Sequence, residues 1–375
     1  MNKCLVAILG LCMVAAPSLP AGDARADGVL LKGGDISMLP RLEELGAVYR
    51  DDGKPADAIG IMMRSGGNCF RVRLFVNPTM KNAVVQDLDY VVKLAQRVKK
   101  AGAVLLLDIH YSDTWADPSH QNKPAVWRDL PFEELEAKVE SYTTEVIATL
   151  RKAGCLPDIV QVGNEITPGF LWPEGKLHRA KEGGWGNFAR LLKAGIRGVK
   201  APLGAEDKVR TMVHIDKGGN ARATSWFFGN LAKHKVEFDM IGLSYYPWWH
   251  GGIEDLRRNL KQTAARFGKP IVVVETAYPW REWKHDKTKS KNMDWPQTLQ
   301  GQKQFLQDVI EAVQATPQGL GRGVLWWYPE SIPNQSLRIW KGGRMALFGT
   351  DGNGQPALDA FRADAPAAAD RAPER

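Results

Sequence analysis

The stretch Ile159-Val-Gln-Val-Gly-Asn-Glu165 is a short apolar run that ends on an amide and a carboxylate. A second stretch, Ile271-Val-Val-Val-Glu275, repeats this pattern farther along the chain. Short runs rich in Val and Ile predict strands that are buried on both faces, as in a parallel sheet. A carboxylate is costly to bury unless it is paired or used. The two stretches therefore predict both the kind of sheet and the place of the chemistry.

Working outward from these two stretches, we count eight apolar runs of the same kind. They cover 29–33, 69–75, 104–110, 159–163, 209–214, 240–244, 271–275 and 323–327. Segments of helical period lie between them, at 87–101, 132–153, 185–199, 253–267 and 299–316. This alternation predicts an α/β protein that folds as a (β/α)₈ TIM barrel. The alternative, an open doubly wound sheet, would need a glycine-rich nucleotide turn, and Gly33-Gly34-Asp35 lacks the required spacing.

The N-terminus has the three parts of a secretory signal peptide. Lys3 precedes an apolar run at 5–14, and Ala24-Arg25-Ala26 provides a small-x-small cleavage site. We expect residues 1–26 to be removed and the protein to be secreted or periplasmic. The apolar run is too short to span a bilayer.

The rest of the chain is expected to form one catalytic domain over 27–363, followed by a disordered C-terminal tail over 364–375. Two cysteines, Cys69 and Cys155, remain after signal cleavage. A single disulfide and two buried thiols are both open interpretations of this pair.

The composition excludes several classes of protein. Apolar residues make up 44% and charged residues 25%, which is ordinary for a globular chain and rules out wholesale disorder. The net charge of +8 would permit a nucleic-acid partner, but the densest basic stretch, 284–291, is interrupted by Asp286 and has no nucleic-acid-binding motif. We therefore expect a monomer with neither a nucleic acid nor a membrane as partner.

Tryptophan is unusually frequent in this chain. Thirteen tryptophans exceed what a core needs, and most of them follow the ends of predicted strands. Because sugars present C–H faces that stack on aromatic rings, this surplus predicts a carbohydrate-binding surface.

Glu165 and Glu275 close the fourth and seventh predicted strands, so a barrel would place them facing each other across its axis. Retaining glycoside hydrolysis needs such a pair, roughly 5–5.5 Å apart, with one acid/base and one nucleophile. The competing interpretation is two strand-end carboxylates that are merely held by Arg71 or Arg73. A nucleophilic Glu275 must stay ionised, whereas Glu165 needs a raised pKa to donate a proton. Asn164 could offer its amide to a sugar hydroxyl.

A metal site is a further interpretation of the polar strand ends. The residues that suggest it are Asp108, His110, Asp113, Asp117, His214 and Asp216. A metal-dependent hydrolase on this barrel would place a His-x-His pair on the first strand, where this chain has Gly33-Gly34-Asp35. Hydrogen-bonding groups around a sugar explain the same residues, so we expect no metal.

Several long stretches together resemble glycoside hydrolase family 53, the arabinogalactan endo-β-1,4-galactanases, over about 31–361. The most specific are Leu107-Asp-Ile-His-Tyr-Ser-Asp-Thr-Trp-Ala-Asp-Pro118, Pro157-Asp-Ile-Val-Gln-Val-Gly-Asn-Glu165, Ile241-Gly-Leu-Ser-Tyr-Tyr-Pro-Trp-Trp-His-Gly251 and Val273-Val-Glu-Thr-Ala-Tyr-Pro279. The resemblance implies a secreted enzyme that hydrolyses internal bonds of type I arabinogalactan with retention. Alternatives are a retaining endo-glycosidase acting on another β-1,4-glycan and a non-catalytic carbohydrate-binding barrel.

The resemblance also assigns roles to individual residues. It implies that Glu165 is the acid/base, that Glu275 is the nucleophile, and that Arg73 and Tyr245 flank the nucleophile. The remaining residues that it places around the sugar are His110, Asn164, His214, Trp249 and Trp327.

Two stretches depart from the family pattern. Some relatives carry an Asp-x-Asp-x-His-x-Asn calcium run after the seventh strand, and the corresponding loop here, 280–289, lacks it, so we expect no cofactor. The eighth strand usually ends in Tyr-Trp-Glu-Pro, and here it ends in Trp326-Trp-Tyr-Pro329, with Glu330 displaced beyond it.

Overall fold

The computed structural model describes residues 28–177, 184–283 and 292–362. Three predicted features lie outside the described residues: the signal peptide, the C-terminal tail and the basic stretch 284–291. This stretch includes most of the loop 280–289, which lacks the calcium run. Within them, no helix combines the length and apolar character that a membrane crossing requires.

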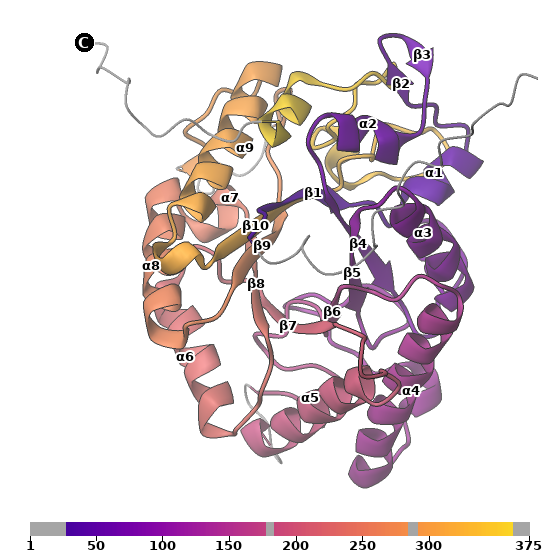
Figure 1. Cartoon of the computed structure of the whole chain (residues 1–375), viewed down its shortest axis with the longest axis vertical. Helices are drawn as coiled ribbons and strands as arrows, with labels where there is room; N and C mark the ends of the chain where they lie inside the picture. The colour runs from indigo at the N-terminus through magenta and orange to yellow at the C-terminus, as the bar shows by residue number, and fades with distance from the viewer. Residues whose placement is uncertain (1–27, 178–183, 284–291, 363–375) are drawn as a thin grey trace, which may run out of the picture.

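Eight parallel strands close into a barrel in the order β1-β10-β9-β8-β7-β6-β5-β4 (Figure 1). The strands are β1 (Leu31–Asp35), β4 (Cys69–Leu74), β5 (Val104–Ile109), β6 (Ile159–Val162), β7 (Arg210–Ile215), β8 (Met240–Tyr245), β9 (Ile271–Thr276) and β10 (Gly321–Trp327). Each matches one predicted apolar run, with ends that differ by one or two residues. The predicted (β/α)₈ barrel is therefore confirmed.

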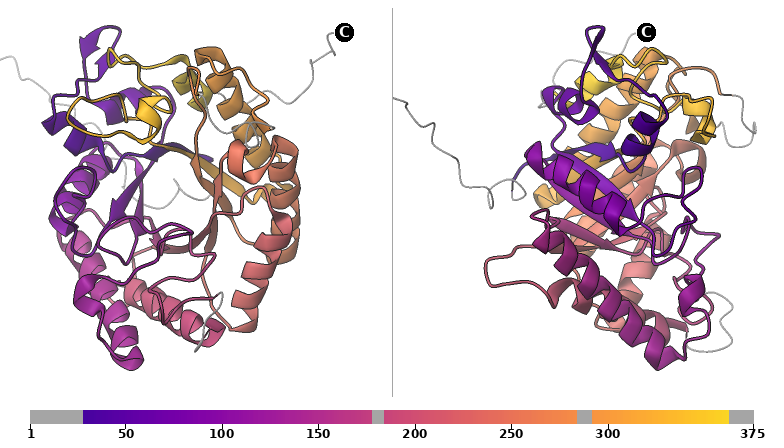
Figure 2. Two further views of the ribbon diagram at one scale, coloured as in Figure 1. Left: turned by 180° about the vertical axis from the view of Figure 1, so that it is seen from behind. Right: turned by 90° about the vertical axis from the view of Figure 1, so that its right-hand side faces the viewer.

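Helices surround the barrel on its outside (Figures 1 and 2). The predicted helices are α3 (Leu88–Lys100), α4 (Phe132–Lys152), α5 (Gly184–Lys200), α8 (Ile253–Phe267) and α9 (Leu299–Gln314). The sequence analysis missed α1 (Leu39–Glu44), α2 (Ala58–Arg64), α6 (Ala221–Lys233), α7 (Pro247–His250) and the hairpin of β2 (Arg50–Asp51) with β3 (Lys54–Pro55). Helix α6 carries a recognisable signal, because the side chain of Asn220 accepts a hydrogen bond from the backbone N–H of Ala223 and caps the helix.

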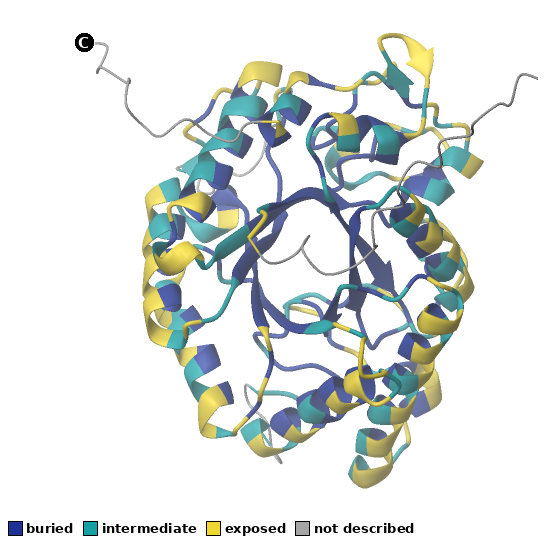
Figure 3. Ribbon diagram, in the orientation of Figure 1, coloured by how far each residue is buried: buried dark blue, intermediate teal, exposed yellow. Residues whose placement is uncertain are grey.

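The core has two parts, one inside the barrel and one between the barrel and the helices. Figure 3 shows the strands buried and the outward faces of the helices exposed. Successive side chains of a strand point to opposite faces, so alternate residues fill the barrel. The interior set is Leu31, Cys69, Val104, Leu106, Ile159, Met212, Met240, Val272, Val274 and Leu325. Cys69 and Cys155 are both buried free thiols, so of the two interpretations the structure supports buried thiols.

A β-bulge interrupts this alternation on β9. Leu243 of β8 pairs with Val273, but the next residue, Ser244, pairs with Glu275. Val274 belongs to the interior cluster, and Glu275 also reaches an interior arginine. Bulges of this kind re-aim side chains at barrel rims, and this one turns Glu275 toward the barrel axis.

Candidate active site

A cavity of about 970 Å³ opens at the carboxyl ends of the barrel strands. Its wall includes Trp115, Asn164, Glu165, Tyr246, Trp249, Glu275, Trp327 and Trp340. The carboxyl ends of all eight strands meet at this face, which is where barrels of this type build their sites.

Glu165 and Glu275 face each other in this cavity. One carboxylate oxygen of each lies within 4.8 Å of the other, close to the roughly 5–5.5 Å separation of a retaining glycosidase. Glu165 follows β6 with a φ of 48°, an unusual backbone conformation for a residue other than glycine. Such strained residues cluster at functional sites, where the surrounding structure must hold them in place.

Glu275 is held by a cation and a phenol. The Nη1 atom of Arg71 donates to its Oε1 at 2.9 Å, and the hydroxyl of Tyr246 donates to its Oε2 at 3.0 Å. Burial raises the pKa of Glu275 to about 7, while the nearby Arg71 cation acts in the opposite direction. Both donors favour the ionised form of this carboxylate.

Glu165 has a different environment. Its Oε1 lies 2.6 Å from the hydroxyl of Ser244, which is a neutral partner. Burial raises the pKa of Glu165 well above its usual range, and the negative charge of Glu275 raises it further. Arg71 and Tyr246 favour the ionised form of Glu275, and Glu165 has no cationic partner among its hydrogen bonds.

Arg71 is the centre of a buried network beneath the cavity. Its guanidinium also contacts Asp35 at 3.2 Å and Asp108 at 2.8 Å, and it donates to Asn164 Oδ1 at 2.7 Å. Burial acts to raise the pKa of Asp108, but Arg71 outweighs it and the pKa falls to about 2. The network therefore ties the amide beside Glu165 to the arginine that holds Glu275.

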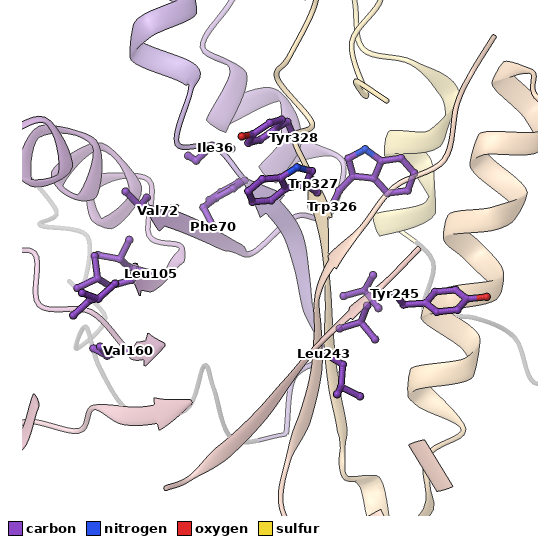
Figure 4. Packing of buried hydrophobic residues seen from close by; sticks show 14 of the residues in the cluster. Ile36, Phe70, Val72, Leu105, Val160, Leu243, Tyr245, Trp326, Trp327 and Tyr328 are labelled. Carbon is purple, nitrogen blue, oxygen red and sulfur yellow. The ribbon is translucent and has the colours of Figure 1, made fainter. Parts of the chain in front are cut away.

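Two of the predicted site assignments need correction. The resemblance implied that Arg73 and Tyr245 flank the nucleophile, but Arg71 and Tyr246 make these contacts. Tyr245 faces outward, where its hydroxyl donates to Gly251 O and its ring stacks on Phe305 of α9. Figure 4 shows the Tyr245 side chain pointing from its strand toward a neighbouring helix. The alternation of β8 explains this, because Met240 points into the barrel and so the even-numbered residues that follow it face inward.

Arg73 lies inside the barrel but contacts aromatic rings instead of Glu275. Its guanidinium stacks 4.0 Å from the ring centroid of Trp115 and lies 3.4 Å from the hydroxyl of Tyr328. Trp115 in turn packs edge-to-face on Trp327. Figure 4 shows the ring of Trp327 stacked on that of Tyr328. Arg73 therefore supports the aromatic wall of the cavity.

The other predicted sugar-site residues divide into two groups. Asn164, Trp249 and Trp327 belong to the cavity wall. His110 and His214 are buried below it: His110 bonds Asp108, and His214 bonds Asn164 and Ser244. These two histidines contact the residues that support the site.

The tryptophans fall into two groups, one in the cavity wall and one in the core. Trp115, Trp249, Trp327 and Trp340 line the cavity. Others that follow strand ends, including Trp127, Trp248, Trp295 and Trp326, are buried and pack in the core. The prediction of a sugar surface made of tryptophan thus applies to a smaller set than the sequence suggested.

Sequence reasoning missed Ser244 and Tyr246. The usable signal was the period of β8, since Gly242, Ser244 and Tyr246 share the face of Met240. Gln161 was also missed; its amide donates to Asp108 Oδ1 at 2.6 Å and so extends the buried network.

A possible cation site lies in the cavity. One carboxylate oxygen each of Glu165 and Glu275 and one ring nitrogen of His214 lie within 4.8 Å of one another. Both ring nitrogens of His214 are already engaged, with Asn164 Oδ1 at 2.9 Å and Ser244 Oγ at 2.8 Å. A metal ion would have to displace one of these hydrogen bonds. The donor set therefore fits hydrogen bonding better than metal binding.

A (β/α)₈ barrel whose cavity holds two facing carboxylates, an amide and aromatic rings defines a glycoside hydrolase. The model of Glycosyl hydrolase family 53 matches residues 31–361. This chain belongs to that family.

Three relatives illustrate the match. The "Uncharacterized protein in bgaB 5'region" of Niallia circulans is 42% identical over 81% of this chain and 84% of its own length. The arabinogalactan endo-beta-1,4-galactanase of Humicola insolens is 36% identical over 82% of this chain and 91% of its own length. The solved Ignisphaera aggregans GH53 catalytic domain has a TM-score of 0.83 at 31% identity, covering 92% of this chain and 99% of that one.

Proposed function

We propose that this glycoside hydrolase is an endo-β-1,4-galactanase that cleaves internal bonds of type I arabinogalactan with retention of configuration. The observation that carries the proposal is the carboxylate pair within 4.8 Å, in a chain 36% identical to a relative named as an arabinogalactan endo-beta-1,4-galactanase. The cavity of about 970 Å³ is large enough for several sugar rings.

In the first step, a carboxylate oxygen of Glu275 attacks the anomeric carbon while Glu165 gives its proton to the departing glycosidic oxygen. The bond between the anomeric carbon and that oxygen breaks, and a glycosyl ester on Glu275 forms. In the second step, Glu165 takes a proton from water, the resulting hydroxide attacks the anomeric carbon, and the ester bond breaks. Glu165 is then protonated again and Glu275 is an ionised carboxylate.

The environments of the two carboxyl groups support these roles. Arg71 and Tyr246 donate to Glu275 and favour the ionised nucleophile. Glu165 has a raised pKa and a hydroxyl partner, as a general acid requires. Trp249, which is 49% exposed in the cavity wall, is a platform for a sugar ring.

The proposal includes the setting of the enzyme. We expect export through the signal peptide 1–26, action as a monomer, a polysaccharide as the only macromolecular partner, and no metal requirement. Dialysis against a chelator should leave the rate on galactan unchanged, and a loss of activity that calcium restores would contradict the last expectation.

The test is the release of reducing ends from linear β-1,4-galactan by the mature protein. Glu165→Gln and Glu275→Gln should each lower the rate by orders of magnitude, whereas Glu254→Gln on the exposed start of α8 should leave it unchanged. NMR of the first product should show the β-anomer, and an α-anomer would refute retention.

Two other results have distinct meanings. A protein that is inert on galactan but cleaves β-1,4-mannan or a β-glucan keeps the retaining chemistry with another substrate. A protein that binds galactan and releases no reducing ends is a carbohydrate-binding barrel.

A further inference from the structure

A chain of short hydrogen bonds runs from Glu165 into the barrel. Glu165 Oε1 lies 2.6 Å from Ser244 Oγ, and Ser244 Oγ lies 2.8 Å from His214 Nε2. The other ring nitrogen, His214 Nδ1, lies 2.9 Å from Asn164 Oδ1. Ser244 and His214 are fully buried, so each proton in this chain must be accounted for within the protein.

The far end of the chain has a fixed polarity. Asn164 Oδ1 accepts from Arg71 Nη2 at 2.7 Å and from Gln161 Nε2 at 3.1 Å, while Asn164 Nδ2 donates to Ala116 O at 2.8 Å. These three partners exclude the flipped amide. Asn164 therefore presents an acceptor to His214.

With the proton of Glu165 on Oε1, one arrangement gives every side-chain proton in this chain of hydrogen bonds an acceptor. Glu165 Oε1–H donates to Ser244 Oγ, the Ser244 hydroxyl donates to His214 Nε2, and His214 Nδ1–H donates to Asn164 Oδ1. A neutral imidazole has one N–H and a hydroxyl has one O–H, so the count is complete for the three side chains. The backbone N–H of Glu165 then faces the protonated Nδ1 at 3.4 Å and does not donate to it.

With Glu165 ionised, the direction must reverse. The carboxylate can only accept, so the Ser244 hydroxyl turns to donate to Oε1, and His214 Nε2 needs a proton to donate to Ser244 Oγ. Nδ1 then has no proton, but the backbone N–H of Glu165 lies 3.4 Å away and can donate to it. Asn164 Oδ1 keeps its two donors from Arg71 and Gln161.

His214 stays neutral in both arrangements. Burial and the nearby Arg71 cation lower its pKa well below the usual value, although Asp108 opposes this. His110 and His250 also face it. Glu165 is faced by Glu275, Asp216 and Asp117.

We propose that His214 changes from the Nδ1–H to the Nε2–H tautomer when Glu165 loses its proton, and that the Ser244 hydroxyl couples the two groups. The proposal concerns equilibrium states. The protonated state holds protons on Oε1, Oγ and Nδ1, the ionised state holds them on Oγ and Nε2, and the difference of one proton goes to solvent.

This coupling deepens the proposed function, because it rests on Glu165 acting first as acid and then as base. In the free enzyme Ser244 accepts from protonated Glu165, and it donates to Glu165 once the proton has left for the glycosidic oxygen. Ser244 and His214 are therefore positioning residues that give Glu165 Oε1 a hydrogen-bond partner in both states.

The experiment is a pH titration of the mature protein labelled with ¹⁵N-histidine. NMR spectra that correlate the ring nitrogens with the carbon-bound ring protons monitor the titration. The His214 signals are assigned with His214→Gln. At low pH we expect Nδ1 of His214 to give the signal of a protonated nitrogen and Nε2 that of an unprotonated one. Over the pH range in which Glu165 titrates, this assignment should reverse, an event called the exchange below. In Glu165→Gln, which carries no such proton, the exchange should be absent.

His110 is the internal control. Its Nε2 faces the Asp108 carboxylate at 2.9 Å and its Nδ1 accepts from the backbone N–H of Ala116 at 2.9 Å, so it must remain the Nε2–H tautomer throughout. Unchanged His110 signals in every variant show that the barrel is intact.

Ser244→Ala should abolish the exchange of the His214 signals, and Ser244→Thr, which retains the hydroxyl, should restore it. Ser244→Ala should also lower kcat by about tenfold, the usual effect of losing a hydrogen bond to a charged group, and move the basic limb of kcat/KM to higher pH. The proposal is wrong if His214 keeps one tautomer across the titration, or if the exchange is the same in Ser244→Ala. Because the titration needs no substrate, its result is separate from the outcome on galactan.

Discussion

The hydroxyl of Tyr246 donates to Oε2 of Glu275 at 3.0 Å and thereby joins the end of β8 to the end of β9. The preceding residue, Tyr245, points to the helical layer and donates to Gly251 O. Two adjacent tyrosines thus have opposite surroundings, which makes them a matched pair for mutation.

Removing each hydroxyl should separate catalysis from stability. Tyr246→Phe should lower kcat by about 10- to 100-fold, because Glu275, the proposed nucleophile, loses a hydrogen bond to its charged form. Tyr245→Phe should leave kcat within about twofold and cost about 0.5–1.5 kcal/mol of stability. Steady-state kinetics on galactan with urea unfolding distinguishes them, and equal kinetic effects would contradict the assignment.

Arg71 should be the most sensitive charge in the barrel. Replacing it by Met leaves Asp35, Asp108 and Glu275 without their shared cation, and breaking such a buried pair costs about 3–5 kcal/mol. Arg73→Met is the comparison, since Arg73 makes one longer ion pair, at 3.7 Å to Asp35. Urea unfolding of both variants checks this, and a larger loss for Arg73→Met would show that the network is centred on Arg73.

The stability of the protein should be greatest at mildly acidic pH. Asp108 has a folded pKa lowered to about 2, so its contribution is present above about 3.8 and is lost as pH falls toward 2. Glu275 has a folded pKa raised to about 7, so its contribution is present below about 4.5 and is lost as pH rises through 7. The carboxyl groups of Glu165 and Glu330, whose pKa values are also raised, act in the same sense as Glu275.

Chemical unfolding at about pH 4.5 and pH 7 measures this difference. In Glu275→Gln, which cannot titrate at this position, the decline between the two pH values should become smaller. A parent protein that is more stable at pH 7 than at pH 4.5 would contradict the expected sign.

Trp249→Ala should weaken substrate binding without weakening the fold. The Trp249 side chain is 49% exposed in the cavity wall, and losing one stacking ring should raise KM for galacto-oligosaccharides about tenfold with kcat little changed. Trp226, which is 41% exposed on α6, is the control tryptophan away from the cavity. If Trp226→Ala raised KM as much, the effect could not be assigned to stacking in the cavity.

Much of the architecture could be predicted because it depends on neighbours along the chain. Each apolar run reports burial of its own strand, and eight of them in alternation with helical segments leave one common closed arrangement. The two carboxylates could be located for the same reason, since each stands at the end of such a run. The short helices α1, α2 and α7 were missed because their apolar spacing is too brief to show a period.

The details of the site depended on relations between strands that are far apart in sequence. Tyr246 could have been separated from Tyr245 by the alternation of β8 alone, but the bulge at Val274 and Glu275 could not, because it exists only in the pairing with β8 and β10. Arg71 and Arg73 share one face of β4, and only their different heights along the barrel axis decide which one reaches Glu275.

The amino-acid sequence by itself therefore determined the strands, the helical layer and the two glutamates that end β6 and β9, since these follow from local burial and periodicity. The tertiary structure decided which arginine holds Glu275, and it placed Ser244 between Glu165 and His214. Those contacts join different strands, and distances of a few ångströms across a barrel are set by strand register and by the bulge, neither of which is recorded in the order of residues along one strand.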